Sequence, residues 1–262
     1  MRKTAPQLNF SGAAGLAIGI LISTFMLYAL ESALKNLVRP LLLPVVLQRL
    51  RARIRTLRTP EDAIHYAFGS NYLSVHFTPV QIREEIGEFL KMLARRPPST
   101  VLEIGTENGG TFFLLARVSA SDAFILSLDL PRGQSYAGWR ENLYRNFASD
   151  RQQIEIFRAD SHNPSTLEKV RGSLGGRRLD LLFIDGDHSY DGVKKDFEMY
   201  STLVAPDGMI AFHDIVDGPE SAVGGVPKFW RELKQTRRHL EIVKDWKQGG
   251  WGIGILPPVI AA

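Results

Sequence analysis

Four aspartates stand at or just beyond the ends of short hydrophobic runs: Asp129, Asp160, Asp185 and Asp214. Ligands of an open α/β sheet bind at the carboxyl ends of the strands, so these carboxylates would face one site. A carboxylate at the position of Asp129 could accept both hydroxyls of a ribose. Asp160 is placed to accept from the exocyclic amine of an adenine. The four acids therefore predict a site for a nucleotide-shaped ligand.

A glycine-rich turn, VLEIGTENGG over residues 101–110, precedes the four acids. Its first residues predict a buried strand, and Thr111–Val118 predicts a helix whose N-terminus would face the ligand. Gly105 and Gly109 would let the backbone approach a ligand closely, because glycine has no Cβ. The spacing E-x-G-x-x-x-G differs from the dinucleotide fingerprint G-x-G-x-x-G. This difference counts against NAD or FAD as the ligand.

The elements that would position these residues alternate between strands and helices. Further strands are predicted over Phe124–Leu128, Ile154–Arg158, Leu179–Asp185 and Met209–Asp214. Val80–Arg96 predicts a helix that begins with a capping box of Thr78 and Gln81. Such alternation favours an α/β fold with a parallel sheet.

The last third of the chain predicts three more features. Val226–Arg238 predicts a helix, and Leu240–Asp245 with Gly252–Leu256 predicts a closing hairpin. Val216–Pro227 is rich in glycine and proline and has no periodic pattern. We expect this loop to act as a lid or a wall of the site, although ordinary surface loops share its composition.

Residues from about Pro79 to Ile255 resemble class I S-adenosylmethionine-dependent methyltransferases. The motifs IDGDHSYDGVKKDF and GMIAFHD resemble the subgroup that includes the cephalosporin-hydroxylase-like and sugar O-methyltransferase families. The resemblance implies a Rossmann-like, doubly wound, mostly parallel sheet of seven strands. It also implies a cofactor site for S-adenosylmethionine, built from Glu103, Gly105, Thr106, Asn108, Gly109, Asp129, Asp160 and Asp185.

The same resemblance implies a metal site. Metal-dependent members hold a divalent cation between acids that end two strands, here Asp185 and the pair His213 and Asp214, with His188 three residues after the first acid. A cation such as magnesium would lower the pKa of an acceptor hydroxyl, and His188 could take its proton, assisted by Asp185. His213 stands where an acid is common in the sugar enzymes, and imidazole suits magnesium less well than oxygen does.

Each of these residues also has a structural explanation. Asp185 could belong to a turn held by aspartate side chains, and His188 could cap the following helix. His213 could be a metal ligand, a substrate contact or a buried structural histidine. Asp191 and Asp196 fit a helix start and a solvated helix face. No role is predicted for the remaining histidines, which are His65, His76, His162 and His239.

Composition excludes some chemistry and locates the positive charge. The chain has 262 residues and no cysteine, which excludes disulfides, thiolate nucleophiles and cysteine metal sites. Residues 1–58 carry a net charge of +8, whereas the remainder carries −4. The basic pI therefore belongs to the N-terminal segment, and we expect no nucleic-acid partner.

No charged residue occurs from Thr4 to Leu30. A cleaved signal peptide, a buried helix of a homo-oligomer and a membrane anchor could each explain this run. Its length favours an anchor, because about 20 apolar residues span a bilayer core. We therefore expect a tail over residues 1–8, a transmembrane helix over 9–31, basic linker helices over 32–78 and a methyltransferase domain over 79–262. The basic residues that follow the run favour a catalytic domain on the cytoplasmic side.

Within the basic linker, Val46–Leu57 could be an amphipathic helix that lies on anionic lipid headgroups, or a solvated helix that packs on the domain. The expected function is a single-pass membrane O-methyltransferase that acts on a hydroxyl of a sugar or lipid-linked sugar. An iron-dependent hydroxylase-like enzyme and a non-catalytic membrane adaptor are the alternatives.

Overall fold

The structure is a computed structural model that describes residues 38, 41–70, 75–131, 138–149 and 151–258. The chain divides into two units, Met1–Pro44 and Val45–Ala262, and the second unit holds the sheet and the helices α2 to α9. The predicted tail over 1–8 and anchor over 9–31 lie outside the described residues. None of the helices that the structure does describe is long and apolar enough to cross a membrane.

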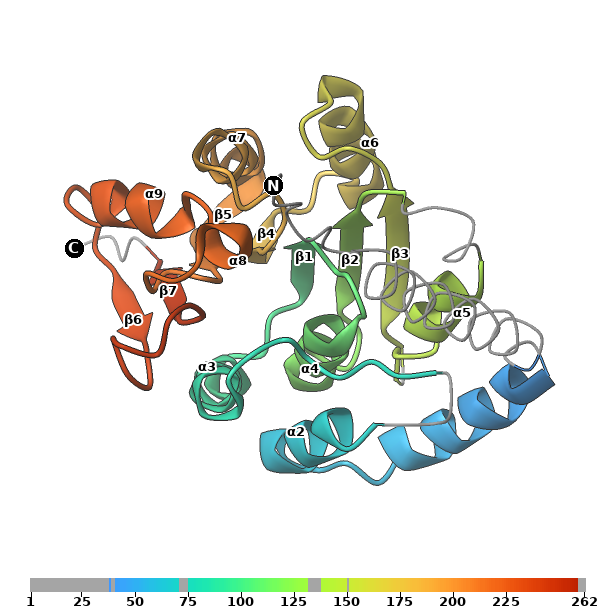
Figure 1. Cartoon of the computed structure of the whole chain (residues 1–262). Coiled ribbons are helices and arrows are strands. Elements are labelled where there is room, and N and C mark those ends of the chain that lie inside the picture. Colours follow the sequence, from blue (N-terminus) through green and yellow to red (C-terminus); the bar gives the residue numbers. More distant parts are fainter. Residues whose placement is uncertain (1–37, 39–40, 71–74, 132–137, 150, 259–262) are drawn as a thin grey trace, which may run out of the picture. The chain divides into compact units, whose positions relative to one another are not determined.

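A single seven-stranded sheet has the order β3-β2-β1-β4-β5-β7-β6 (Figure 1). Strands β1 to β5 pair in parallel, whereas β7 pairs antiparallel with both β5 and β6. The predicted Rossmann-like, mostly parallel sheet is therefore confirmed. The strands are β1 Thr100–Ile104, β2 Phe124–Asp129, β3 Gln153–Arg158, β4 Leu179–Ile184, β5 Val204–Phe212, β6 Leu240–Ile242 and β7 Ile253–Leu256.

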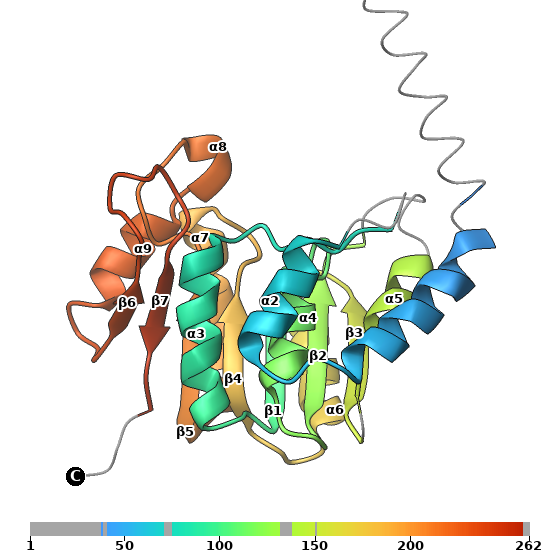
Figure 2. The ribbon, with the colours of Figure 1, turned by 90° about the horizontal axis from the view of Figure 1, so that it is seen from below.

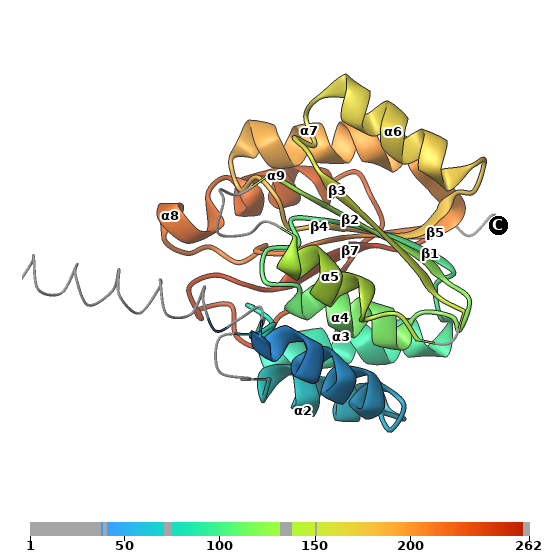
Figure 3. The same ribbon diagram turned by 90° about the vertical axis from the view of Figure 1, so that its right-hand side faces the viewer.

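Helices cover both faces of the sheet. Figure 3 shows α6, α7 and α9 on one face and α3, α4 and α5 on the other, and Figure 2 shows that α2 lies outside α4. Every residue of β1 and of β2 is buried, as expected for parallel strands covered on both sides. The helices are α2 Pro60–Phe68, α3 Arg83–Arg95, α4 Gly110–Val118, α5 Trp139–Arg145, α6 Pro164–Leu174, α7 Tyr190–Tyr200, α8 Glu220–Val223 and α9 Val226–Leu233, with a 3₁₀ turn at Ser201–Leu203.

Helix α3 begins later than its sequence predicts. Its N-cap is Ile82, an aliphatic residue, so the predicted capping box of Thr78 and Gln81 is wrong. A capping box does form at the start of α2, where Thr59 and Asp62 exchange hydrogen bonds with each other's backbone N–H. The side chain of Gln81 is therefore available for another role.

Helix α9 ends at Leu233, five residues before the predicted end at Arg238. The polar run that follows Leu233 offers no apolar side chain to bury, so tertiary packing does not extend the helix. The predicted closing hairpin is confirmed as β6 and β7, with shorter strands than expected.

The helix of residues 41–54 decides between the two interpretations of the basic linker. Its apolar side chains Val46, Leu50 and Ile54 are buried. The Arg51 guanidinium Nε donates to Asn146 Oδ1, just after α5, at 2.5 Å. The apolar stripe therefore packs on the domain and is not presented to lipid.

Candidate active site

A cavity of about 660 Å³ opens at the carboxyl ends of the parallel strands, where the strand order reverses between β1 and β4. Its wall includes four of the predicted cofactor residues and three of the other predicted site residues: Gly105, Asp129, Asp160, Asp185, His188, His213 and Asp214. Glu103, Thr106, Asn108 and Gly109 are not among the lining residues. Four of the eight residues predicted for the cofactor therefore line the cavity, and their role there stays a prediction.

Gly105 allows β1 and β4 to approach each other closely. Its φ is +89°, and a Cβ there would lie 1.9 Å from the carbonyl oxygen of Asp185. Any side chain at this position would therefore push the β4 end away, and with it the Asp185 carboxylate. Glycine is required here by the approach of two strands as well as by its backbone angle.

Gly109, at the N-cap of α4, packs against Tyr144 of α5. Its φ is +82°, and a Cβ would lie 2.3 Å from the Tyr144 ring. The Tyr144 hydroxyl in turn donates to the carbonyl oxygen of Glu107 at 2.5 Å. Thr106 also turns inward, with its hydroxyl 2.7 Å from that of Ser127. These contacts support the shape of the turn from behind.

Glu103 is only 1% exposed, and its Oε2 has no hydrogen-bond partner among the described residues. Burial, with the nearby charges of Asp185 and Asp129, raises the pKa of Glu103 well above its usual value. A buried acid without a full set of partners costs free energy. Such a group just behind a ligand cavity is a candidate for a ligand-dependent role.

Asp129 and Asp160 border the part of the cavity that lies over β2 and β3. Asp129 accepts from the backbone N–H of Glu107 at 3.1 Å and from Arg158 at 3.2 Å. Asp160 accepts from the backbone N–H of His162 at 2.8 Å. These hydrogen bonds hold both side chains in place. Because each carboxylate oxygen can accept two hydrogen bonds, both side chains can still accept from a ligand.

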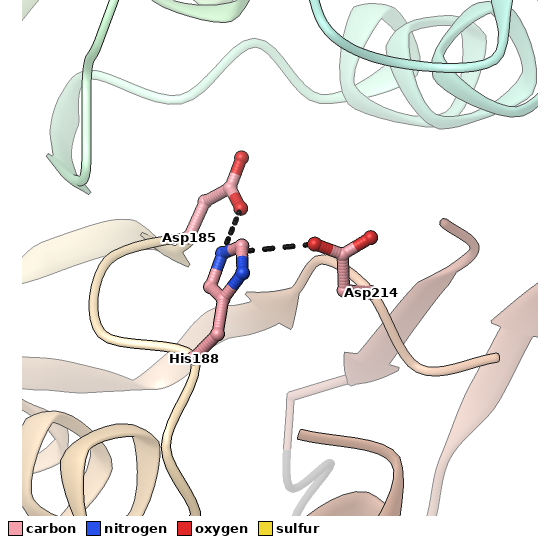
Figure 4. Close-up of side chains that lie close together, drawn as sticks. All are labelled: Asp185, His188 and Asp214. Atoms are coloured by element: carbon pink, nitrogen blue, oxygen red, sulfur yellow. Dashed lines mark hydrogen bonds and ion pairs between the residues drawn. The ribbon is translucent and has the colours of Figure 1, made fainter. Parts of the chain in front are cut away.

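Two carboxylates and two imidazoles meet at the ends of β4 and β5. His188 Nε2 lies 3.4 Å from Asp185 Oδ1 and 3.6 Å from Asp214 Oδ2 (Figure 4). His213 Nδ1 lies 3.1 Å and 3.4 Å from the same two oxygens. The His188 Nδ1–H donates to the carbonyl oxygen of Ala222 at 2.5 Å, which directs Nε2 toward the carboxylates.

The charges in this group depend on one another. The Asp185 hydrogen bond raises the pKa of His188 to about 9. Burial acts to lower the pKa of His213, but the charges of Asp185 and Asp214 outweigh it and raise that pKa to about 10. Burial acts to raise the pKa of Asp185, and the two imidazolium groups instead lower it. The carboxylate charges therefore favour the protonated form of both imidazoles.

Three of the residues predicted around a metal could hold one ion. Asp185, His188 and Asp214 offer ligand atoms that all lie within 4.8 Å of one another. His213 is 4% exposed, its Nδ1 faces the same two carboxylates, and its Nε2 has no partner among the described residues. A metal-binding role for His213 stays a prediction.

The backbone holds Asp214 in an uncommon conformation. Asp214 has φ of +60°, and Trp251, which is also at φ +60°, donates its N–H to Asp214 Oδ1 at 3.0 Å. A left-handed conformation is unusual for a bulky residue such as tryptophan and is often found at functional sites. Trp251 also lies on the cavity wall, a position that the sequence did not indicate.

Two residues of the α3 segment support this centre, and sequence reasoning missed both. Gln81 is 7% exposed and donates from Nε2 to Asp185 Oδ2 at 3.2 Å. Glu85 accepts from the backbone N–H groups of Lys244 and Gly252, in the segment that also carries Trp251. The pattern of polar residues near a helix start indicated only capping, because the partners lie more than 100 positions away in the sequence.

A second pair of an acid and an imidazole lies near the adenine end of the predicted cofactor site. Asp196 of α7 is fully buried, and His162 Nε2 lies 3.3 Å from its Oδ1. The prediction that Asp196 belongs to a solvated face is therefore wrong, whereas Asp191 is exposed in the first turn of α7. His162, for which no role was predicted, is part of the cavity wall.

The loop after β5 forms another part of the wall, as predicted for residues 216–227. It contains the short helix α8, and Ser221, Ala222 and Val223 line the cavity. The carbonyl oxygen of Ala222 binds His188, so the wall and the titratable centre are directly connected.

Comparisons with known proteins agree with this architecture. Residues 102–215 match a family model described as a methyltransferase domain. An uncharacterized protein of Sinorhizobium fredii is 29% identical over 147 residues, which are 55% of this chain and 16% of that protein. An uncharacterized protein of Acanthamoeba polyphaga mimivirus is 32% identical over 124 residues, which are 45% of this chain and 52% of that protein. The chain thus matches about half or less of the length of these curated relatives.

Two solved structures share the fold. An O-methyltransferase of Bacillus cereus in complex with SAH has a TM-score of 0.51 at 19% identity and covers 76% of this chain and 90% of that one. The O-methyltransferase of tomaymycin synthesis from Streptomyces achromogenes, in complex with SAM, has a TM-score of 0.50 at 17% identity and covers 77% and 91%. At these identities the likeness is one of fold.

Proposed function

We propose that this chain, whose residues 102–215 match a family model of a methyltransferase domain, is a class I enzyme that transfers a methyl group from S-adenosylmethionine to a hydroxyl. The observation that carries the proposal is the acid-lined cavity at the reversal of strand order, most of whose lining residues lie in the region 102–215 that matches the methyltransferase family model. Ligands of doubly wound sheets bind at this point.

The residues of the cavity fit the cofactor. A volume of about 660 Å³ lies within the range of roughly 300–1,000 Å³ that small-molecule sites occupy. Asp129 and Asp160 can accept from ribose hydroxyls and from an adenine amine. The carboxylates also favour a cationic ligand, and the cofactor carries a sulfonium. When bound, the cofactor supplies a methyl group attached to that sulfonium, which makes the methyl carbon electrophilic.

The acceptor hydroxyl must lose a proton, and His188 Nε2 is placed to take it. Its partner Nδ1–H is engaged with Ala222, so only Nε2 can act as the base. With a pKa of about 9, His188 holds a proton at neutral pH until the carboxylate charges that raise its pKa are offset. Asp185 and Asp214 could hold a divalent cation that offsets these charges and lowers the pKa of the hydroxyl.

His188 could instead be a ligand of that cation, together with Asp185 and Asp214. The variant His188→Ala separates the two roles, because alanine has neither a basic nitrogen nor a metal-ligand atom. A fall in kcat with unchanged manganese affinity identifies a base, whereas a parallel loss of manganese affinity identifies a ligand.

We further propose that the acceptor is a sugar, free or lipid-linked. Trp251 lines the cavity and is 37% exposed, so its ring offers an apolar face to the C–H groups of a pyranose. The uncharged run Thr4–Leu30 supports the lipid-linked form and a membrane-tethered enzyme, because tethering raises the effective concentration of a membrane substrate. A cytoplasmic orientation stays a prediction, as does a homo-oligomer.

An iron-dependent hydroxylase is less well supported. Non-haem iron oxygenases use two histidines and one carboxylate with open positions. Among the described residues, the group of side chains that could hold one metal ion has one histidine and two carboxylates. His213 is not part of this group, and its Nδ1 faces Asp185. A non-catalytic adaptor would not need an imidazole held between a buried and a partly buried carboxylate.

The test is calorimetric titration of the full chain with S-adenosylmethionine. We expect Asp129→Asn to weaken binding by about tenfold or more, because a charge-assisted acceptor is lost. Glu84→Gln, an exposed change of the same kind on α3, is the matched control and leaves binding unchanged. A folded chain that fails to bind the cofactor would overturn the proposal.

A further inference from the structure

A second cavity, of about 780 Å³, lies at the amino ends of the parallel strands. Its lining includes Pro97 before β1, Ser119 and Ser121 between α4 and β2, and Gln152 before β3. The candidate active site opens at the carboxyl ends of the same strands. The second cavity is therefore a separate feature, which the methyltransferase function does not require.

Five arginines line this second cavity, and no acidic residue is found among its described lining residues. They come from separate parts of the chain: Arg51, Arg55 and Arg58 from the segment before α2, Arg117 from the end of α4, and Arg145 from the end of α5. We call this feature the arginine cavity. Convergence of three segments distinguishes it from a run of charge along one solvated helix.

Packing and hydrogen bonds hold part of the arginine cavity in place. Arg51 donates to Asn146, and Arg117 donates to the carbonyl oxygen of Phe147 and to Gln152. Buried Ile54 fixes the helical turn that carries Arg55. The cavity is thus formed by residues anchored to the domain.

Arg55 and Arg58 differ from the other three arginines of the cavity, because the guanidinium groups of those three have side-chain or carbonyl partners. Arg96, Arg171 and Arg231 each pair with an acid, whereas no acidic side chain within the described residues pairs with the guanidinium of Arg55 or of Arg58. Concentrated cations without acidic partners repel one another, and this repulsion is relieved when an anion binds.

The donors in the arginine cavity match phosphate. Guanidinium groups bind phosphate oxygens in pairs of hydrogen bonds, and hydroxyls complete such sites. Thr59, Ser121 and Ser149 supply hydroxyls on the same wall. We propose that the arginine cavity binds a phosphate-bearing ligand, either a lipid phosphomonoester headgroup or a soluble phosphate.

Two double variants of equal charge test the site in the full chain. Arg55→Gln with Arg58→Gln removes the two arginines of the cavity whose guanidinium groups have no hydrogen-bond or ion-pair partner among the described residues. Arg237→Gln with Arg238→Gln removes two exposed arginines beyond α9, outside the arginine cavity. Circular dichroism and the thermal midpoint confirm that each variant folds. Arg55→Lys with Arg58→Lys keeps the charge and removes the paired hydrogen bonds.

The probes are inorganic pyrophosphate, followed by calorimetry, and vesicles of phosphatidylcholine with or without phosphatidic acid, followed by co-sedimentation. We expect the Arg55/Arg58 glutamine variant to weaken binding by about tenfold or more, the lysine variant to lie between it and the native chain, and the Arg237/Arg238 variant to bind normally. Pyrophosphate binding with this pattern supports a soluble phosphate. The same order of binding among the variants, seen only with phosphatidic acid vesicles, supports a lipid headgroup. Vesicles of phosphatidylcholine alone measure how much the rest of the chain binds to a membrane.

Two results would overturn the proposal. One is that neither probe distinguishes the Arg55/Arg58 glutamine variant from the native chain. The other is an equal loss of binding in both glutamine variants. Such a result would show that the probes respond to the net charge of the chain and not to the arginine cavity.

Discussion

Glu85 of α3 accepts the backbone N–H of Gly252 at 2.9 Å, and this bond ties α3 to the loop that holds the acidic end of β5. The preceding residue, Trp251, donates its N–H to Asp214. One helical turn before Glu85, Gln81 donates to Asp185. The start of α3 therefore orients both carboxylates of the candidate metal site, Asp185 directly and Asp214 through the loop.

Glu85→Gln tests this support. The Glu85 carboxylate also accepts from Lys244 N and Gln248 Nε2. In Glu85→Gln, the NH₂ group of the amide would face N–H donors, and hydrogen bonds would be lost. We expect a loss of about 1–3 kcal/mol in the free energy of unfolding, measured by urea denaturation. We also expect a 10–100-fold weaker manganese affinity, the usual effect of losing a partner behind a metal ligand.

The matched control for Glu85→Gln is its neighbour Glu84→Gln. Glu84 binds the same lysine, Lys244, but through Nζ and at an exposed position. We expect no change in the urea midpoint or in manganese affinity for this control. If Glu85→Gln behaved in the same way as the control, the loop would be held by other contacts.

Gln81→Met tests the direct contact with Asp185. Methionine has a similar length and no donor, so the carboxylate loses one hydrogen bond while the packing is kept. We expect kcat/KM for methyl transfer to fall by about 10–100-fold. Gln235→Met, an exposed change of the same kind, should leave kcat/KM unaltered. A Gln81→Met enzyme with native kcat/KM would show that Asp185 needs no orientation from α3.

The buried Asp196 predicts how stability depends on pH. Burial raises the pKa of Asp196 to about 6, against a usual value of 3.8. A raised folded-state pKa means that its contribution to stability is complete below pH 3.8 and is lost as the pH rises through about 6. Asp196→Asn removes this titration. We therefore expect Asp196→Asn to gain about 2 kcal/mol relative to the native chain between pH 4 and pH 8, by urea denaturation at both values.

Glu198→Gln is the control for that comparison, because Glu198 is an exposed acid on the same helix. Its stability should follow that of the native chain at both pH values. If the difference between Asp196→Asn and the native chain were the same at pH 4 and pH 8, Asp196 would not be the group that titrates.

The sheet could be predicted because its signals are local. Buried parallel strands are continuous hydrophobic runs, and the acids at their ends stand next to those runs in the sequence, as at Asp129 and Asp185. Every predicted strand was found, with bounds that shift by at most five residues. The position of the cavity followed from the strands, since all their carboxyl ends meet at one edge.

The support behind the site could not be predicted from local patterns. Gln81 and Asp185 are 104 positions apart, and Glu85 and Gly252 are 167 apart. Asp196 was assigned to solvent because its neighbours in α7 are polar, yet the helix turns this one acid toward His162. Helical periodicity indicates which face is apolar, but it does not reveal a single polar residue buried with a partner from another segment.

Gly109 and Gly175 allow the conformational cost of a glycine to be separated from its packing. Both are in the left-handed αL conformation, with φ of +82° and +57°, so an alanine at either position costs about 1–2 kcal/mol. A Cβ at Gly109 would also lie 2.3 Å from the Tyr144 ring, whereas the nearest atom to a Cβ at Gly175 is the carbonyl oxygen of Ser173 at 4.0 Å. Overpacking adds about 1–3 kcal/mol at Gly109. We therefore expect Gly109→Ala to lower the urea midpoint clearly more than Gly175→Ala, and equal midpoints would show that Tyr144 moves aside without cost.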